Sequence, residues 1–545
     1  MEIIVRNTVC PQHPDTSVGV LSRVRDAVLD GTLGHVTVFT GETAAENEET
    51  ALWPGVLRHV VAAEEKERSR SLTGELRDGS GSVLILDCAC DIRAGVLPAF
   101  ANLGTATVLV TEREDLGNRL YAMTRREGKL ALILEGLGTS GAFGYLGALF
   151  LTERDRAALC AILEEGGFRL PWQTVVSRLA QRTRVQCAAL TRDVHGKDVV
   201  VGSSLAGGSH ARTYIRLHPA SGRRTVRKEA VGAGCGKLTE EIGWLHGLEA
   251  TAGRHFPDVV ESRIESHGVS MDLAYHHLPT LRRLILAGEV DEEEAARWTR
   301  RTLATLRRDL YPVGHRSAPD DYVRRTHLDR IERRLAETAA ALPDRRRLWT
   351  ADTVRVNGVS LRGVQHLVTA VANDQEALRI LTPERLVRTH GDPHFDNILI
   401  DRDNHRFFLI DPRGNSGYDV AYDLGKIWHS VNSLYDLIHD GHVRVEAGDD
   451  EINYTFTSPR LVAFYRGVRE RVHAWLLATN WAQDDAHWLL KVRLAEAAHM
   501  CSVMPFHIVR DARETVALAC YARGLELLNS LYEDVTAATA TARVA

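Results

Sequence analysis

Eight residues in the C-terminal half carry the strongest signal in the chain, His390-Gly391-Asp392-Pro393-His394-Phe395-Asp396-Asn397. They are followed directly by segment 398–401. An apolar segment, 407–410, is followed directly by Asp411. Phosphoryl transfer needs positioning and charge neutralisation more than covalent help from the protein. A carboxylate beside the attacking hydroxyl, with an amide oxygen and a second carboxylate as Mg²⁺ ligands, would supply both.

This arrangement resembles the aminoglycoside phosphotransferase and choline kinase superfamily, whose fold is similar to that of protein kinases. The resemblance implies that Asp392 is the catalytic base and that Asn397 and Asp411 bind Mg²⁺. It implies that His390 shapes the loop. ATP and Mg²⁺ are then the expected cofactors, and the partner is a small-molecule acceptor with a hydroxyl group.

The residues before this motif fit the small lobe of such an enzyme. Segments 199–204, 212–217 and 225–230 have the pattern of three successive strands, and a helical segment, 237–250, follows. From residue 281 onward the pattern is mainly helical. A sheet-rich lobe followed by a larger helical lobe is the layout of a two-lobed, α+β kinase.

The resemblance assigns cofactor-binding residues within this small lobe. Lys228 would contact the ATP phosphates, and Glu241 would pair with Lys228 from the following helix, although Glu240 is a close rival. A loop containing Gly207, Gly208 and Ser209 would cover the phosphates. The alternatives are an exposed strand lysine and an ordinary hairpin turn.

Two segments after the motif, 410–414 and 418–430, resemble a bacterial subgroup found near capsule and sugar-nucleotide genes. In that subgroup the kinase-like domain often follows a nucleotidyltransferase domain. Asp423 is expected to anchor a helix start to the catalytic loop. Arg413 either reaches a phosphate or pairs with a carboxylate. His507 either faces the substrate or is a buried, hydrogen-bonded histidine.

Residues 1–190 alternate strand-like and helical segments, which predicts an α/β domain with a mostly parallel sheet. Segments 18–30, 35–41, 47–51, 85–92 and 143–147 resemble a sugar-phosphate or choline-phosphate nucleotidyltransferase, and Asp91 falls where that family has a metal-binding aspartate. The glycine-rich phosphate loop of the family is absent, because no glycine lies between Met1 and Gly19. We therefore expect a degenerate domain that has lost nucleotidyl transfer.

Length and composition set the remaining expectations. A chain of 545 residues predicts several domains, here 1–190, 191–280 and 281–545. A net charge of −5 gives no reason to expect nucleic-acid or membrane binding. No secretory signal opens the sequence, and eight scattered cysteines suggest a cytoplasmic protein with reduced thiols. A homodimer is left open, because nucleotidyltransferase-like domains often dimerise.

The acceptor is not determined by the sequence. An acidic pocket that included residues 291–294 would suit an aminoglycoside or choline, whereas His276, His277, Arg282 and Arg283 would suit an anionic acceptor. The arginine- and alanine-rich usage favours a bacterial protein of secondary metabolism or surface glycan synthesis. A bifunctional kinase and nucleotidyltransferase, and a non-catalytic ligand-binding protein, are the alternative hypotheses.

Overall fold

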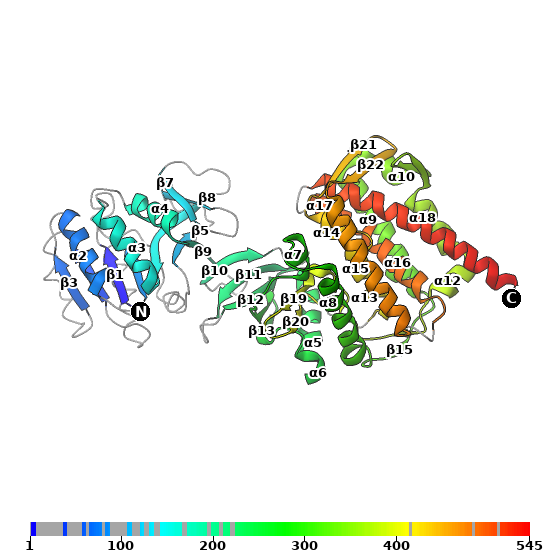
Figure 1. The fold of residues 1–545 in the computed structure, drawn as a ribbon, viewed down its shortest axis with the longest axis horizontal. Coiled ribbons are helices and arrows are strands. Elements are labelled where there is room, and N and C mark those ends of the chain that lie inside the picture. Colours follow the sequence, from blue (N-terminus) through cyan, green and yellow to red (C-terminus); the bar gives the residue numbers. More distant parts are fainter. Residues whose placement is uncertain are drawn as a thin grey trace. The chain divides into compact units, whose positions relative to one another are not determined.

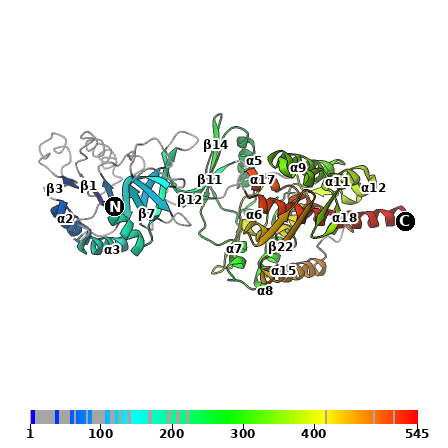
Figure 2. The ribbon, with the colours of Figure 1, turned by 90° about the horizontal axis from the view of Figure 1, so that it is seen from above.

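The computed structural model describes most of the residues after position 224 and separate segments before it. The described residues are 2–6, 36–40, 57–61, 65–78, 82–87, 106–111, 120–124, 130–135, 142–165, 172–192, 198–205, 211–218, 224–413, 417–481, 485–509 and 513–544. The protein divides into two compact units (Figures 1 and 2). The first unit comprises Met1–Leu238 and Val259–Tyr275, and the second comprises Thr239–Asp258 and His276–Ala545.

One sheet of fourteen described strands runs through the first unit. Twelve of the strands follow the order β13-β14-β12-β11-β10-β9-β5-β8-β4-β1-β2-β3, and β6 and β7 extend from β8. The strands are β1 (Glu2–Arg6), β2 (Val36–Thr40), β3 (Leu57–Val61), β4 (Val83–Asp87), β5 (Thr107–Thr111), β6 (Leu120–Thr124), β7 (Leu130–Glu135), β8 (Ala142–Leu151), β9 (Gln186–Arg192), β10 (Asp198–Leu205), β11 (Arg212–Leu217), β12 (Arg224–Ala230), β13 (Val259–Glu265) and β14 (Gly268–Ala274).

The sheet is mixed. The pairs β3–β2, β2–β1, β1–β4 and β5–β9 are parallel, but β8 is antiparallel to both β4 and β5, and β6 is antiparallel to β7 and β8. The expectation of a mostly parallel sheet for residues 1–190 is therefore met only in part. From β9 to β13 every pairing is antiparallel, beginning with β9 and β10. The strands predicted for the small lobe therefore continue the sheet of the N-terminal residues.

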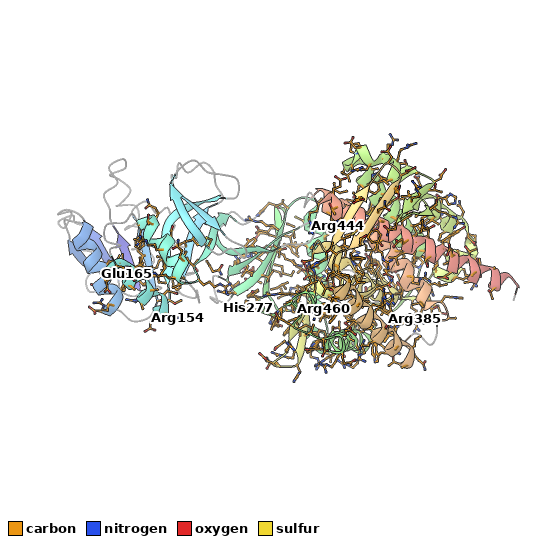
Figure 3. All side chains as sticks on the ribbon, turned by 45° about the horizontal axis from the view of Figure 1, so that its top comes forward. Arg154, Glu165, His277, Arg385, Arg444 and Arg460 are labelled. Carbon is orange, nitrogen blue, oxygen red and sulfur yellow. The ribbon has the colours of Figure 1, made fainter. Side chains whose placement is uncertain are left out.

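Helices cover the N-terminal part of this sheet. They are α2 (Glu65–Asp78), α3 (Glu153–Glu164) and α4 (Trp172–Arg182). Leu159, Ile162 and Val176 are fully buried against strand residues such as Ile85 and Leu149. Removing such side chains from water is the main stabilising contribution to a core of this kind. Arg154 and Glu165 are exposed at the two ends of α3 (Figure 3).

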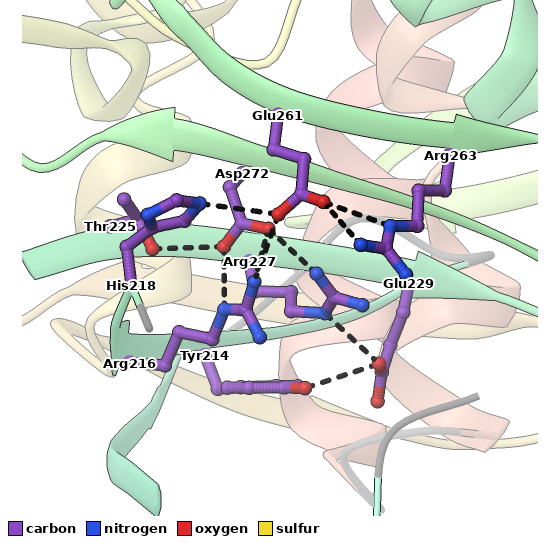
Figure 4. A network of polar contacts seen from close by, with 9 residues as sticks. All are labelled: Tyr214, Arg216, His218, Thr225, Arg227, Glu229, Glu261, Arg263 and Asp272. Atoms are coloured by element: carbon purple, nitrogen blue, oxygen red, sulfur yellow. Dashed lines mark hydrogen bonds and ion pairs between the residues drawn. The ribbon is translucent and has the colours of Figure 1, made fainter. Parts of the chain in front are cut away.

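A buried network of charges lies on one face of strands β11, β12 and β14 (Figure 4). Asp272 is fully buried and accepts two hydrogen bonds from Arg216, both at 2.7 Å, and one from Arg227 at 2.6 Å. Thr225 donates a fourth bond to Asp272 at 2.9 Å. Glu229 accepts a hydrogen bond from the Tyr214 hydroxyl at 3.1 Å. The sheet thus buries several charges that depend on one another.

The second unit is mainly helical, as the sequence predicts from residue 281. Its helices are α5 (Gly234–His246, which begins in the first unit), α6 (Ala250–Gly253), α7 (Leu281–Leu286), α8 (Glu292–Thr305), η6 (Leu306–Leu310), η7 (Arg324–Leu328), α9 (Asp329–Ala341), η8 (Pro343–Arg345), α10 (Arg346–Thr350), α11 (Val364–Asn373), α12 (Gln375–Leu381), η9 (Phe395–Asn397), α13 (Val420–Val431), α14 (Tyr435–His439), α15 (Pro459–Ala478), α16 (Trp488–Met500), α17 (Met504–Val509) and α18 (Glu514–Val544). Within the described segments, no helix combines the length and apolar character needed to cross a membrane.

Three small sheets complete the second unit. They are formed by β15 (Arg316–Ser317) with β18 (Arg385–Leu386), by β19 (Ile398–Asp401) with β20 (Arg406–Leu409), and by β16 (Thr353–Val356), β17 (Val359–Arg362), β21 (Val443–Ala447) and β22 (Glu451–Phe456). Helix α13 packs closely on α16, because a Cβ atom on Gly425 would lie 2.6 Å from the Ala495 Cβ. This contact fixes the helix that carries much of the candidate site.

Candidate active site

The buried carboxylate of Asp423 anchors the loop before η9. Asp423, in the first turn of α13, accepts hydrogen bonds from the backbone amides of His390 at 3.0 Å and Gly391 at 2.6 Å. The Tyr311 hydroxyl donates to the same carboxylate at 3.2 Å. Gly391 has a φ of 82°, and a Cβ there would lie 2.8 Å from the side chain of Arg413. Asp423 thus anchors the loop as the sequence predicts, and glycine is required at its turn.

Asp392 projects from this loop beside a lysine. Its Oδ1 lies 2.8 Å from the Nζ of Lys426, on α13, and 4.0 Å from the Nε2 of His394. Its backbone amide donates to His390 Nδ1 at 3.1 Å, so His390 does shape the loop. Burial alone would raise the pKa of Asp392, but the charges of Lys426, His394 and Arg413 outweigh it and hold that pKa below its usual range. The carboxylate is therefore ionised at neutral pH.

The hairpin of β19 and β20 brings Asn397 and Asp411 together. Ile398 is paired with Leu409, and the Ile410 amide donates to the Asn397 carbonyl at 3.1 Å. The side-chain amide of Asn397 donates to the Asp392 carbonyl at 2.8 Å, which leaves its side-chain oxygen for a cation. These oxygen donors fit Mg²⁺, which would take its other ligands from phosphate and water. The described residues contain no cluster of three His, Cys, Asp or Glu side chains that could hold a metal alone.

Asp411 adopts a backbone conformation that most residues avoid, with a φ of 57°. Such strain is concentrated at functional sites. We expect Asp411→Gly to raise the free energy of unfolding by about 1 kcal/mol or less, because glycine adopts this conformation without steric strain. We expect the same substitution to abolish Mg²⁺-dependent nucleotide binding. Thermal unfolding and calorimetric ATP titration with and without Mg²⁺ measure the two effects.

His405 supplies the matched control for this substitution. It lies in the turn of the same hairpin, is exposed and has a φ of 49°. His405→Gly should relieve similar strain and leave nucleotide binding unchanged. An Asp411→Gly variant that binds ATP with wild-type Mg²⁺ dependence would rule out Asp411 as a ligand.

A second buried carboxylate, that of Asp436, is linked to the loop through the Ser430 hydroxyl. Asp436 accepts hydrogen bonds from the hydroxyls of Ser430 at 3.4 Å and Tyr465 at 3.0 Å, and Ser430 Oγ accepts one from the Phe395 amide at 3.1 Å. Burial raises the pKa of Asp436 from 3.8 to about 7, against the opposing charge of Arg282. The neutral acid is therefore the form favoured in the folded protein below that pH.

This pKa predicts a pH dependence of stability. Between about pH 4 and pH 7 the folded protein keeps a proton on Asp436 that the unfolded chain has released, so the contribution of this group to stability falls as the pH rises. We expect Asp436→Asn to remove that part of the slope, because asparagine does not ionise. Urea unfolding of both proteins from pH 5 to pH 8 measures it. Parallel slopes for the two proteins would contradict the assignment.

Two further predicted residues, Arg413 and His507, are hydrogen-bonded to tyrosine hydroxyls. Arg413 is exposed, and its guanidinium donates to the Tyr422 hydroxyl rather than to a carboxylate. His507 is buried and hydrogen-bonded to the Tyr435 hydroxyl at 3.1 Å, which matches the alternative of a buried histidine.

The predicted ATP-binding residues stay predictions. Lys228 is buried on β12, on the sheet face opposite Arg227 and Glu229, where it is paired in register with Thr213 and Met271. Glu241 lies on α5 and is half-buried. The loop with Gly207, Gly208 and Ser209 lies outside the described residues, as do Asp91 and the side chain of Asp87.

Sequence reasoning missed Lys426, although the segment 418–430 that contains it was singled out. Lys426 lies three residues after Asp423, so the two side chains share one face of α13. Because Asp423 is expected to contact the loop, this spacing predicts that Lys426 also faces the loop. It places a cation next to Asp392.

Comparison with known proteins gives one family for the C-terminal part of the sequence. Residues 201–461 match the model of the phosphotransferase enzyme family, which confirms the resemblance seen in the sequence for this region. No curated protein matches the sequence.

Three of the solved structures similar to this protein match about a third of its residues each. A protein from Bacillus anthracis assigned as a glucose-1-phosphate thymidylyltransferase is 11% identical, with 37% of this chain and 89% of that one covered and a TM-score of 0.28. HddC from Yersinia pseudotuberculosis is 9% identical, with 34% and 89% covered and a TM-score of 0.27. A nucleoside-diphosphate-sugar pyrophosphorylase from Vibrio cholerae RC9 is 13% identical, with 36% and 93% covered and a TM-score of 0.26. Likeness at this level says nothing of activity.

Proposed function

We propose that the protein is an ATP- and Mg²⁺-dependent phosphotransferase that phosphorylates a hydroxyl group of a small molecule. The observation that carries the proposal is the Asp392 loop. An ionised carboxylate beside Lys426 lies on a loop whose following hairpin brings Asn397 and Asp411 together. The match of residues 201–461 to the phosphotransferase enzyme family supports it. We take β10 to β14 with α5 as the small lobe and the helical second unit as the large lobe.

Each residue then has a role in positioning or in charge neutralisation. Bound Mg²⁺·ATP supplies the phosphoryl group and neutralises part of its charge. Asn397 and Asp411 would hold the metal, and Lys228 would contact the phosphates. Asp392 would orient the acceptor hydroxyl and take its proton late in the transfer. Lys426 keeps Asp392 ionised and lies close enough to counter charge on the transferred group.

The test uses the full-length protein. Calorimetry should show ATP binding that depends on Mg²⁺, and a coupled assay should show ADP release when an accepted hydroxyl compound is added. Failure to bind ATP in the presence of Mg²⁺ would refute the proposal. CTP, UTP or dTTP binding that ATP does not displace would instead favour the bifunctional hypothesis, which remains a prediction from the sequence.

A further inference from the structure

One face of α13 carries polar side chains next to Asp392. Tyr422, Lys426 and His429 follow one another at intervals of four and three residues, so they lie along the same side of the helix. Lys426 contacts Asp392 directly. His429 is buried, and within the described part of the protein neither of its ring nitrogens has a hydrogen-bond partner.

Two arginines from other segments converge on this face. Arg330, on α9, donates to the Tyr422 hydroxyl at 2.6 Å, and Arg413 donates to the same hydroxyl oxygen. His499, on α16, lies 3.5 Å from Arg330 through its Nδ1. Two guanidinium groups therefore share one hydroxyl oxygen atom, and like charges brought this close repel one another.

No described carboxylate neutralises either arginine through an ion pair, and Lys426 is the only one of the three cations that forms one, with Asp392. Asp392 is therefore the one described carboxylate joined by an ion pair to any of these three cations, and it also acts electrostatically on Arg330 and Arg413. The pKa of Lys426 responds to burial and to the nearby positive charges of the two arginines. Burial lowers its pKa, and the charges of Arg413 and Arg330 lower it further, against the opposing charge of Asp392. Arg330 and Arg413 thus lie close together without a carboxylate partner among the described residues. An anion that bound to them would stabilise this part of the protein.

Two of the four basic residues that the sequence indicates for acceptor binding, Arg282 and His276, are engaged elsewhere. Arg282 pairs with Asp396 at 2.8 Å and with Asp440 at 3.0 Å. His276 stacks on Phe408 with ring centroids 3.9 Å apart, and His277 is exposed (Figure 3).

The acidic segment 291–294 also forms ion pairs with arginines. Glu292 pairs with Arg471 and Glu294 with Arg402, both at 2.8 Å, in the first turn of α8. Because these two carboxylates are already paired with arginines, they are poorly suited to binding a cationic acceptor.

We propose that the acceptor is an anion, a hydroxyl compound carrying a carboxylate or phosphate group that Arg330 and Arg413 bind while its hydroxyl reaches Asp392. The proposal rests on the phosphotransferase function proposed above. The acceptor oxygen would form a bond to the γ-phosphorus of ATP as the bond to the β–γ bridging oxygen breaks. ADP leaves with that bond's electron pair, and the acceptor proton passes to the Asp392 carboxylate. Paired guanidinium groups are well suited to the fixed geometry of an oxyanion.

The test measures anion binding with the nucleotide site filled. The full-length protein is saturated with Mg²⁺ and a non-hydrolysable ATP analogue, and its melting temperature is followed as chloride is replaced by inorganic phosphate or by acetate at constant ionic strength. We expect at least one of the two anions to raise the melting temperature. A stronger effect of phosphate points to a phosphorylated acceptor, and a stronger effect of acetate points to a carboxylic acid.

Arg413→Met is the decisive variant, because the side chain is exposed and its loss should leave the fold intact. It should weaken the apparent anion affinity about tenfold or more, since hydrogen bonds to charged groups contribute strongly. Arg379→Met, which removes an exposed arginine paired with Glu376 on α12, is the matched control.

The outcomes separate this inference from the proposed function. Stabilisation by neither anion, or equal stabilisation of the wild type and Arg413→Met, overturns the anionic acceptor even when the ATP analogue binds. Failure of the analogue to bind with Mg²⁺ overturns the phosphotransferase itself. If Arg330→Met also folds, it should reproduce the loss seen for Arg413→Met.

Discussion

Asp392→Asn is expected to lower turnover by about a hundred- to ten-thousandfold, the range typical of a lost general base. Asparagine keeps the shape of the side chain but can neither accept the proton of the acceptor nor pair as an anion with Lys426, 2.8 Å away. Nucleotide binding should be nearly unchanged, because Asn397 and Asp411, the proposed metal ligands, are untouched. Steady-state turnover and calorimetric ATP titration separate these two effects.

The matched control is Asp403→Asn, in the exposed turn between β19 and β20. It removes one negative charge from the same hairpin without touching the loop, so its turnover should equal that of the wild type. Near-wild-type turnover in Asp392→Asn would show that this carboxylate is not the base.

Asp272→Ala is expected to destabilise the first unit by about 3–5 kcal/mol, the usual consequence of removing one partner from a buried ion pair. Asp272 is the common acceptor for Arg216 and Arg227, and all three side chains are buried (Figure 4). Without it, two guanidinium groups remain buried with less negative charge near them. Chemical denaturation followed by tryptophan fluorescence and circular dichroism measures the loss.

A quadruple variant tests whether this loss comes from the unpaired charges. Replacing Asp272 with leucine, Arg216 and Arg227 with methionine, and Glu229, the other carboxylate partner of Arg227, with glutamine removes these buried charges together. Apolar groups of similar volume often match or exceed the stability of a buried ion pair, so this variant should recover most of the lost stability. If Asp272→Ala unfolds at the wild-type denaturant concentration, the network does not stabilise the sheet.

The candidate site could be predicted where its residues are close in sequence. The loop with Asp392, the position of Asn397 and the strand that ends at Asp411 belong to one hairpin, so their spacing alone places them together. Lys426 and Arg330 could not be assigned in this way, because α13 and α9 bring them to Asp392 through helix packing. Arg413 was singled out, but its partner, the Tyr422 hydroxyl, depends on how α13 lies against the loop.

The fold was predictable to a similar degree. The sequence pattern predicts strands β10, β11 and β12 to within one residue at each end. The hairpin of β13 and β14 is not predicted, because β13 has no fully buried residue and carries charged side chains without a clear alternation. The joining of β9 to β10 is also not predicted, because the boundary expected near residue 190 lies within β9.

That joined sheet limits how the protein can be dissected. The boundary predicted near residue 190 falls within β9, and a gene split there would break the hydrogen bonds between β9 and β10. Each fragment would then expose a strand edge with unpaired amides and carbonyls, which readily recruits another strand or forms aggregates. Fragments produced in the same cell would have complementary edges and could reassemble. Point substitution is therefore a safer route than truncation for assigning roles to the N-terminal residues.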